Sequence, residues 1–435
     1  MKVLSLFDGM ACGMLAMQSA GIKADRYVAF EIEKYAVQTS SHNFPMIEHR
    51  GDVFQADFTE FSGFDFLVGG SPCTYWSIAQ KNNRETEASG MGWELFSQYV
   101  RALHEAQPMW FIYENNKSMS NAIRESITHT FGFEPICINS SLVSAQNRQR
   151  LYWVGRRNLD GTYSRVKVDQ PEDRGILLRD VLDGTVRIPG YGDEDKARPL
   201  GANYSNNCGG FEHRMFSENR NKQQVDMIAE PIGIGYRGRM EGGKWVKRYE
   251  SNEEPKANAL TTCQYDSMVS EPVRIGTYPR SDGVLLDHQQ SRIYSIDAKS
   301  TTINANGGGW GAKTGLYAFP VEYEGEVPVK AVSGSDGKTY TVYEVKDGQI
   351  TIKDKQYPIK LADGFYIIRK LTVSECKRLQ TVPDWYEFPV SDTQAYKMLG
   401  NGWTVEVIAH LIKATQTDEL EEEQLDLFKM LGVGA

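Results

Sequence analysis

The chain lacks long hydrophobic runs and paired cysteines. No run of about eighteen apolar residues occurs in its 435 residues, so we expect no membrane span. The opening stretch, residues 1–8, is too short for a signal peptide, and no cleavage pattern follows it. The six cysteines are widely scattered, with no CxxC pair: Cys12, Cys73, Cys137, Cys208, Cys263 and Cys376. This distribution argues against a disulfide framework and a zinc site, so we expect no bound metal and a reducing, cytoplasmic setting.

The excess of negative charge argues at first against nucleic acid as a partner. The net charge is −9, from 48 Lys and Arg against 57 Asp and Glu. Residues 184–368, however, hold 23 basic and 24 acidic residues, whereas the rest of the chain holds 25 and 33. Six of those acids lie in the C-terminal run 418–426, a pattern typical of a solvated helix face. Bulk charge therefore neither supports nor excludes DNA, and the motifs must decide.

Short apolar runs alternate with amphipathic segments over the first 155 residues. Runs rich in Val, Ile, Phe and Tyr predict strands at 3–7, 27–31, 64–68, 110–114 and 151–155. Helical patterns lie between them, at 13–20 and 95–105. This alternation predicts an α/β fold with a doubly wound parallel sheet, in which ligands bind beyond the carboxyl ends of the strands.

The composition changes at about residue 176. From there the chain is rich in Gly, Asn, Ser, Thr and Tyr, with short strand-like runs and many turn signals. Helical patterns return after Arg369, at 373–379 and 405–414. We therefore expect three parts: an α/β domain over 1–175, an inserted irregular β-rich domain over 176–368, and a return to the first domain over 369–435.

Candidate cofactor residues follow the first three expected strands. Gly9 and Gly13, in the loop after the first strand, allow backbone to approach a ligand near a helix N-terminus, although a tight structural turn is an equal alternative. Glu31 ends the second strand, where an acid accepts hydrogen bonds from ribose hydroxyls. Asp52 lies near the end of the third strand, where it suits an adenine amino group. Together these residues predict a cofactor that contains adenosine.

A candidate nucleophile and a candidate acid follow two further strands. Cys73 comes after a Gly-Gly loop and the rigid Pro72, a position that favours a reactive thiolate over an inert buried cysteine. Glu114 ends the next strand, beside the expected position of that loop, and is placed to donate a proton. Arg148 and Arg150 are two residues apart on one face of an extended segment, a pair that suits phosphate or a base carbonyl.

These motifs, in this order, resemble the cytosine-5 DNA methyltransferase family of bacteria and phages. The resemblance covers both ends of the chain and is interrupted only where the family carries its variable target-recognition region. It rests on the Phe7-Asp8-Gly9 loop with Gly13, Glu31, Gly51-Asp52-Val53, Pro72-Cys73, Leu95-Phe96 with Arg101, Glu114-Asn115, the segment from Gln146 to Arg150, the segment from Arg369 to Gln380, and Gly400-Asn401-Gly402.

The resemblance implies a Rossmann-like methyltransferase sheet that uses S-adenosylmethionine. By carry-over, Cys73 attacks C6 of a cytosine flipped out of the duplex, while Glu114 stabilises the protonated N3 and contacts the exocyclic amino group. Arg150 holds the cytosine O2, and Arg148 supports the intermediate and the neighbouring loops. The cofactor residues implied are Phe7, Asp8, Gly9, Gly13, Glu31, Asp52 and Asn401.

The chain departs from the family pattern at four positions. Thr74 follows the cysteine where many bacterial members have glutamine, and Asn116 replaces a valine after the Glu-Asn pair. Gly402 stands in place of a serine, and Trp403 follows it. We expect the last two changes to reshape the cofactor pocket near the methyl donor.

The expected partner is double-stranded DNA, because an insertion of about 190 residues suits sequence recognition in a groove. In that insertion the Gly-rich loop 304–313 is the best candidate to enter a groove, with Asn306 and Lys313 as base or phosphate contacts; a flexible connection between strands is the alternative. We expect a monomer on DNA, and the sequence leaves open a cognate restriction endonuclease. A tRNA cytosine-5 methyltransferase and a non-catalytic DNA-binding regulator with the same fold remain alternatives.

Overall fold

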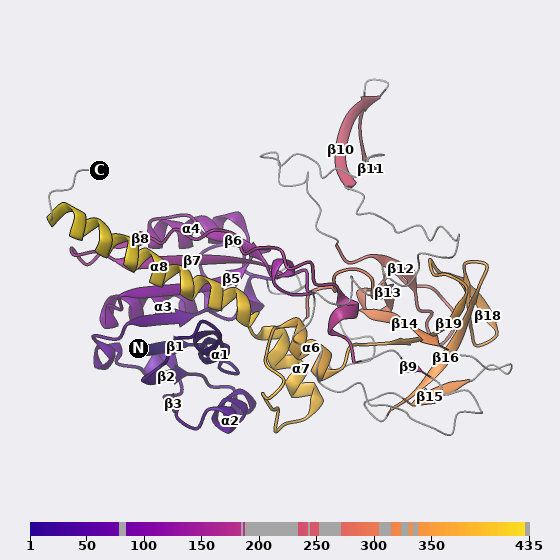
Figure 1. Cartoon of the computed structure of the whole chain (residues 1–435), viewed down its shortest axis with the longest axis horizontal. Helices are drawn as coiled ribbons and strands as arrows, with labels where there is room; N and C mark the ends of the chain where they lie inside the picture. Colours follow the sequence, from indigo (N-terminus) through magenta and orange to yellow (C-terminus); the bar gives the residue numbers. More distant parts are fainter. Residues whose placement is uncertain are drawn as a thin grey trace, which may run out of the picture.

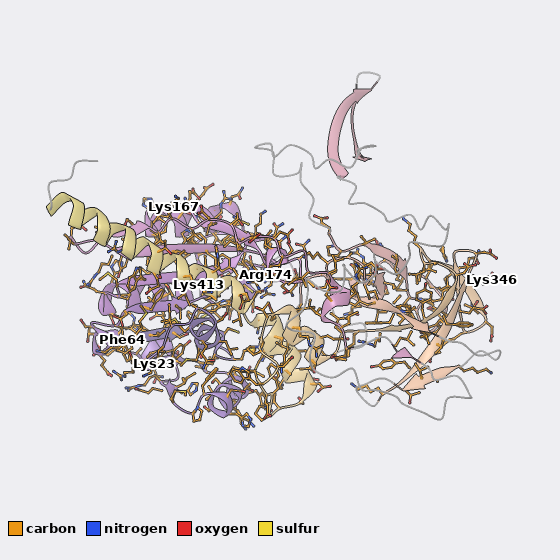
Figure 2. The ribbon with its side chains drawn as sticks, in the orientation of Figure 1. Lys23, Phe64, Lys167, Arg174, Lys346 and Lys413 are labelled. Atoms are coloured by element: carbon orange, nitrogen blue, oxygen red, sulfur yellow. The ribbon has the colours of Figure 1, made fainter. Side chains whose placement is uncertain are left out.

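A computed structural model describes residues 1–77, 84–183, 186–187, 234–241, 244–251, 271–303, 315–322, 330–333 and 338–430. Two β-sheets dominate it, and helices α6 (Val373–Leu379) and α7 (Asp392–Asn401) lie between them (Figure 1). Side chains fill both sheet regions in Figure 2, with Phe64 at the first sheet and Lys346 at the far end of the second.

The first sheet has eight strands in the order β3-β2-β1-β4-β5-β7-β6, with β8 (Tyr163–Arg165) beside β7. Its other strands are β1 (Lys2–Leu6), β2 (Arg26–Phe30), β3 (Glu48–His49), β4 (Phe66–Gly69), β5 (Trp110–Asn116), β6 (Ile136–Asn139) and β7 (Gln149–Arg157). The strand order reverses between β1 and β4, which pair with each other in parallel. Such a reversal leaves a crevice at the carboxyl edge of the sheet, where α/β proteins bind ligands.

Helices cover both faces of the first sheet. Because successive strand residues point to opposite faces, Val3 faces α1 (Cys12–Ser19) and α8 (Val405–Met430), whereas Leu4 faces α3 (Gly90–Ala106) and α4 (Asn121–Phe131). Helix α2 (Lys34–Asn43) contributes a buried alanine to the first of these cores. The predicted doubly wound α/β fold is confirmed.

The expectation of a purely parallel sheet is wrong at one edge. Strand β7 runs antiparallel to both β5 and β6, while β1 to β5 pair in parallel. The short connection 140–148 joins β6 to β7, and so short a link can join antiparallel neighbours only. The apolar pattern of 151–155 predicted the strand, but burial on both faces does not specify its direction.

The second sheet has nine strands and includes β19 (Gly364–Arg369), which leads directly towards α6. Its other strands are β9 (Val186–Arg187), β12 (Arg274–Thr277), β13 (Arg292–Tyr294), β14 (Leu316–Glu322), β15 (Ala331–Ser333), β16 (Thr339–Lys346), β17 (Gln349–Ile352) and β18 (Lys355–Pro358). Strands β10 (Ile234–Glu241) and β11 (Lys244–Ser251) form a separate antiparallel ribbon. The domain boundaries after residues 175 and 368 stay a prediction.

The return of the chain begins with a well-capped helix. The hydroxyl of Thr372 accepts from the Glu375 N–H, and the Glu375 carboxylate accepts from the Thr372 N–H, so both ends of a capping box are present. The same carboxylate pairs with the buried guanidinium of Arg369 at 2.7 Å. Helix α6 occupies 373–379 as predicted. Among the residues described, no helix is long and apolar enough to cross a membrane.

Candidate active site

The loops after β1 and β4 meet at the carboxyl edge of the first sheet, on the two sides of the strand reversal. The β4 loop carries Cys73 at the start of a short 3₁₀ turn. The Cys73 carbonyl accepts from the backbone N–H of Trp76 and Ser77, and from the side-chain amide of Asn116 at 3.4 Å. These contacts fix the backbone under a free, half-buried thiol.

The chain beyond this turn is fastened to the end of β5. The buried indole of Trp76 donates to Glu85 Oε2 at 3.1 Å, and Glu85 also accepts from the Gly92 N–H at the start of α3. Arg84 donates to the carbonyls of Trp76 and Ser118. The Cys73 loop is thereby tied to the start of α3 and to the segment that follows β5.

The Glu114 carboxylate lies between two nitrogen donors. Arg150 Nε is 3.0 Å from Glu114 Oε1, and the indole Nε1 of Trp403 donates to Oε2 at 3.0 Å. Arg150 is on β7, paired opposite Asn116, which places it diagonally across from Glu114 on the neighbouring strand. Only 12% of the Glu114 side chain is exposed. A Cβ at Gly70 would lie 2.9 Å from Glu114 Oε2, so a larger residue there would displace the carboxylate.

The Arg148 side chain is buried and binds backbone carbonyls of the protein itself. Its guanidinium donates to the carbonyls of Ile303, Gly400 and Gly402 at 2.9–3.1 Å, and the residue is 3% exposed. Burial and the nearby charge of Arg150 lower the pKa of Arg148 to about 10, while Glu114 and Cys73 act in the opposite direction, so it stays a cation at neutral pH. The residue pattern predicted two arginines facing a substrate; in the structure only Arg150 lies beside Glu114.

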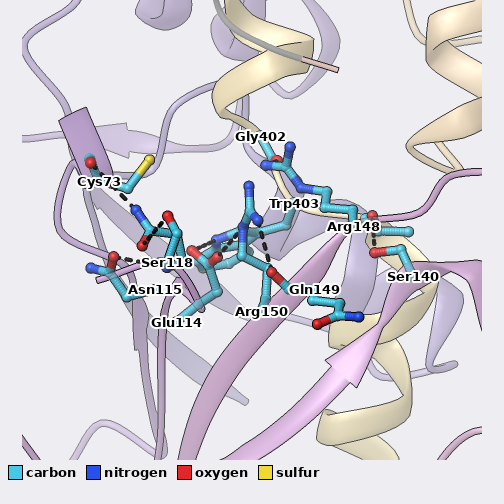
Figure 3. Close-up of polar contacts among 12 residues, drawn as sticks. Cys73, Glu114, Asn115, Ser118, Ser140, Arg148, Gln149, Arg150, Gly402 and Trp403 are labelled. Carbon is cyan, nitrogen blue, oxygen red and sulfur yellow. Dashed lines mark hydrogen bonds and ion pairs between the residues drawn. The ribbon is translucent and has the colours of Figure 1, made fainter. Parts of the chain in front are cut away.

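Figure 3 shows Cys73, Glu114, Arg148 and Arg150 gathered around one region, with Trp403 entering from the returning segment. Sequence reasoning thus selected four residues that the fold brings together. It missed the contact of Trp403 with Glu114, because Trp403 was expected to lie at the cofactor pocket. No spacing rule links residue 403 to residue 114, so this contact had no local signal.

The predicted cofactor acid Glu31 lies beside the loop after β1. Its carboxylate accepts from the backbone N–H of Gly9 at 2.8 Å, and from those of Ile32 and Glu33. Three of about four acceptor positions are thereby in use, which leaves one for a ligand hydroxyl. Gly9 has φ +59°, and a Cβ there would meet nothing within 4 Å. The loop therefore leaves free space beside Gly9, and the Glu31 carboxylate holds its backbone in place.

Two other predicted cofactor residues face the core. The Asp8 carboxyl accepts from the hydroxyls of Ser5 and Tyr27, and burial raises its pKa to about 6. The Asp8 N–H also donates to the Phe30 carbonyl and the Asp8 carbonyl accepts from the Ala11 N–H, so one carbonyl acceptor position is all that its backbone leaves for a ligand. A Cβ at Gly13 would lie 2.5 Å from the Tyr27 hydroxyl, so Gly13 allows α1 to pack closely on the sheet.

Two further residues that were predicted to bind the cofactor lie at a short turn and at a helix end. Asp52 caps a short 3₁₀ turn through the Phe54 N–H. Asn401 ends α7, and at the next residue, Gly402, a Cβ would lie 3.2 Å from Cys12 Sγ in α1. Sequence reasoning missed the apolar side chain of Ile32, which is 75% exposed directly after Glu31 and offers a flat contact for a ring.

The predicted DNA contacts Asn306 and Lys313 lie outside the described residues. The segment just before them, 298–303, is docked on the connection between β6 and β7. Lys299, 1% exposed, donates to the carbonyls of Ser141, Ser144 and Ile176 at 2.6–3.2 Å. Burial lowers the pKa of the Lys299 ammonium. Its role had no sequence signal, because lysine is ordinarily a surface residue.

No cluster of three or more His, Cys, Asp or Glu side chains that could hold a metal ion occurs within the described residues. The donors at this edge of the sheet are instead a thiol, carboxylates and a guanidinium. Such a set suits nucleophilic attack on a base, with hydrogen bonds to its polar edge.

Comparisons with known proteins agree with this geometry. A family model described as C-5 cytosine-specific DNA methylase matches residues 1–417. An orphan methyltransferase of Bacillus phage SPR, M.SPRI, is 26% identical, with 95% of this chain and 97% of the relative covered. The type II methyltransferase M.HgiCI of Herpetosiphon aurantiacus is 23% identical, with coverage of 99% and 98%.

A solved structure, the Entamoeba histolytica methyltransferase EhMeth, has the same fold, with a TM-score of 0.52 and 13% identity over 96% of this chain and 98% of that one. The predicted family, fold class and activity are confirmed, and the tRNA and regulator alternatives are not favoured. The chain belongs to the C-5 cytosine-specific DNA methylase family and is a DNA (cytosine-5)-methyltransferase.

Proposed function

We propose that Cys73, Glu114 and Arg150 are the catalytic residues of this methyltransferase, and that Arg148, predicted as catalytic with them, is a positioning residue. The observation that carries the proposal is the Glu114 carboxylate, fixed by Arg150 at the same edge of the sheet as the Cys73 loop.

The reaction begins when the Cys73 thiolate forms a bond to C6 of cytosine. The electron pair of the C5–C6 double bond shifts into the ring, N3 takes up a proton, and Glu114 stabilises that proton and the exocyclic amino group. When bound, S-adenosylmethionine supplies a methyl group that is activated by its positive sulfur. After C5 has gained the methyl group, the proton that N3 took up from solvent returns to solvent, and the C5 proton also passes to solvent. The electrons of the C5–H bond restore the C5–C6 double bond as the C6–sulfur bond breaks, which releases the Cys73 thiolate.

The two arginines have different tasks. Arg150 lies beside Glu114 and is placed to hold the cytosine O2 while it keeps the carboxylate oriented. Arg148 joins the carbonyls of Ile303, Gly400 and Gly402, and so holds the end of the recognition segment and the cofactor-side segment together. Because three buried carbonyls depend on it, Arg148 acts through position more than through contact with the base.

The residues around the β1 loop fit S-adenosylmethionine. Glu31 has one acceptor position left for a ribose hydroxyl, and Asp52 lies near the next strand end, where an adenine amino group is a suitable donor. Ile32 and Phe54, 75% and 45% exposed, provide apolar surface for the adenine ring. The backbone of Phe7, Asp8 and Gly9, together with Asn401, completes the predicted set, whereas Gly13 serves it through helix packing.

The DNA substrate is proposed to be duplex, with the target cytosine flipped out to reach Cys73. Residues 176–368 form the recognition domain, with the 304–313 loop, including Asn306 and Lys313, as its proposed reader. We infer a monomer on DNA in the cytoplasm of a bacterial or phage-infected cell. The type II and orphan relatives support a role either with a restriction endonuclease or without one.

Transfer of labelled methyl groups tests this proposal. The protein is incubated with labelled S-adenosylmethionine and either duplex DNA or tRNA, and cellular DNA is sequenced after bisulfite treatment to locate the methylated site. We expect label in duplex DNA only, at one short recurrent sequence. Label in tRNA alone would overturn the assignment of the substrate.

A further inference from the structure

Trp403 connects the returning segment to the base-binding acid. It lies between α7 and α8, and its indole donates to Glu114 Oε2 at 3.0 Å (Figure 3). The preceding residue, Gly402, accepts from Arg148 at 2.9 Å and packs against Cys12 in α1. The backbone that leads to the indole is therefore held by the connection before β7 and by helix α1.

The two donors to Glu114 determine which acceptor positions of its carboxylate remain for the substrate. A carboxylate has about four acceptor positions, two on each oxygen. Arg150 occupies one on Oε1 and Trp403 occupies one on Oε2. One position on each oxygen remains, which matches the two neighbouring N–H groups of a cytosine protonated at N3. With only one donor the carboxylate could rotate and lose this match.

We propose that Trp403 is a positioning residue that orients the Glu114 carboxylate for the target cytosine. The inference rests on the proposed role of Glu114. A rigid indole with a single N–H is suited to this task, because it orders few torsions and donates in one direction. Since Trp403 belongs to the C-terminal return, base recognition depends on that segment being docked on the first sheet.

A double-mutant cycle tests this proposal. Trp403→Phe keeps a ring and removes the N–H, and it is made in the natural chain and in a Glu114→Gln background. In the natural background we expect kcat to fall about 10- to 100-fold, the range for one hydrogen bond to a charged group. KM for duplex DNA and Kd for S-adenosylmethionine should stay within threefold. In the Glu114→Gln background the same change should cost less than threefold.

Trp385→Phe is the matched control, because Trp385 is a half-exposed tryptophan that packs on Phe44, away from the site. The kcat of this variant should not change. An equal loss from Trp403→Phe in both backgrounds, or no loss in either, would overturn the positioning role. An unchanged cofactor Kd and an unchanged melting temperature exclude a folding defect. Where turnover is too slow to measure kcat, the rate at which 5-fluorocytosine DNA traps Cys73 is measured instead. Full activity of Glu114→Gln would instead refute the proposed role of Glu114.

Discussion

Replacement of Lys299 by methionine should loosen the junction between the recognition segment and the catalytic sheet. The Lys299 ammonium is buried and donates to three backbone carbonyls, two of them in the connection that leads to Arg148. Methionine has a similar length but no donor, so three buried acceptors lose their partner. Alongside these, the Ser300 N–H donates to the Ala145 carbonyl at 2.7 Å, and the Asn147 N–H donates to the Ser300 carbonyl at 3.0 Å.

The magnitude follows from these contacts. A buried acceptor left without a partner costs about 1–3 kcal/mol. Removal of the ammonium also removes its own desolvation cost, so the sum for three acceptors is reduced to about 3–5 kcal/mol. At 1.4 kcal/mol for each factor of ten, the junction should open about two to four orders of magnitude more often.

Hydrogen–deuterium exchange measures this opening at the amides of Asn147 and Ser300. We expect much faster exchange in Lys299→Met, together with reduced turnover, because Arg148 donates to Ile303 at the end of the same segment. Lys346→Met is the control, since Lys346 is exposed on β16 and makes no contact at this junction. Exchange within threefold of the natural chain would refute the reasoning that Lys299 fastens the two parts.

Three further predictions concern Asp8, Glu31 and Arg148. The pKa of Asp8 is raised to about 6 in the fold, so the native state binds more protons than the unfolded state between about pH 4 and 6. The free energy of unfolding of Asp8→Asn should therefore rise relative to that of the natural chain, by about 3 kcal/mol in total, as pH increases through that window, and the melting temperature should follow it. A difference that does not vary with pH would contradict this. Glu31→Gln should weaken S-adenosylmethionine binding at least about tenfold in calorimetry, whereas Glu33→Gln, which loses only a surface ion pair, should not. Arg148→Lys loses the planar fork that reaches three carbonyls and should lower kcat about 100-fold, and a kcat within threefold of the natural value would argue against its role.

The sequence predicted those features of the fold and the site that depend on residues close together in the chain. The buried strands that lead to Glu31, Cys73 and Glu114 show as short apolar runs. Glu31 and Cys73 follow the ends of their strands, and Glu114 lies two residues before the end of β5, so the edge that carries the site was predictable. Helix α6 was predicted at 373–379 and lies there. A strand end and a helix cap depend on neighbouring residues, which a single sequence shows directly.

Contacts between distant segments were not predictable in this way. The antiparallel direction of β7, the indole of Trp403 on Glu114 and the ammonium of Lys299 on Ser141 each join residues far apart in the chain. Asp8 was predicted as a cofactor residue, and its side chain contacts Ser5 and Tyr27, because the turn after β1 directs it into the core. These outcomes depend on packing, which no residue pattern specifies.

The most direct test of the account is covalent trapping on DNA that contains 5-fluorocytosine at the methylated site. Fluorine at C5 cannot leave as a proton, so attack by Cys73 should end in a stable adduct that mass spectrometry assigns to the Cys73 peptide. Cys73→Ala should form no adduct and lose several orders of magnitude in turnover, whereas Cys137→Ala, which removes another free, half-buried cysteine, should behave as the natural chain does. An adduct that persists in Cys73→Ala, or that maps to another residue, would contradict the account.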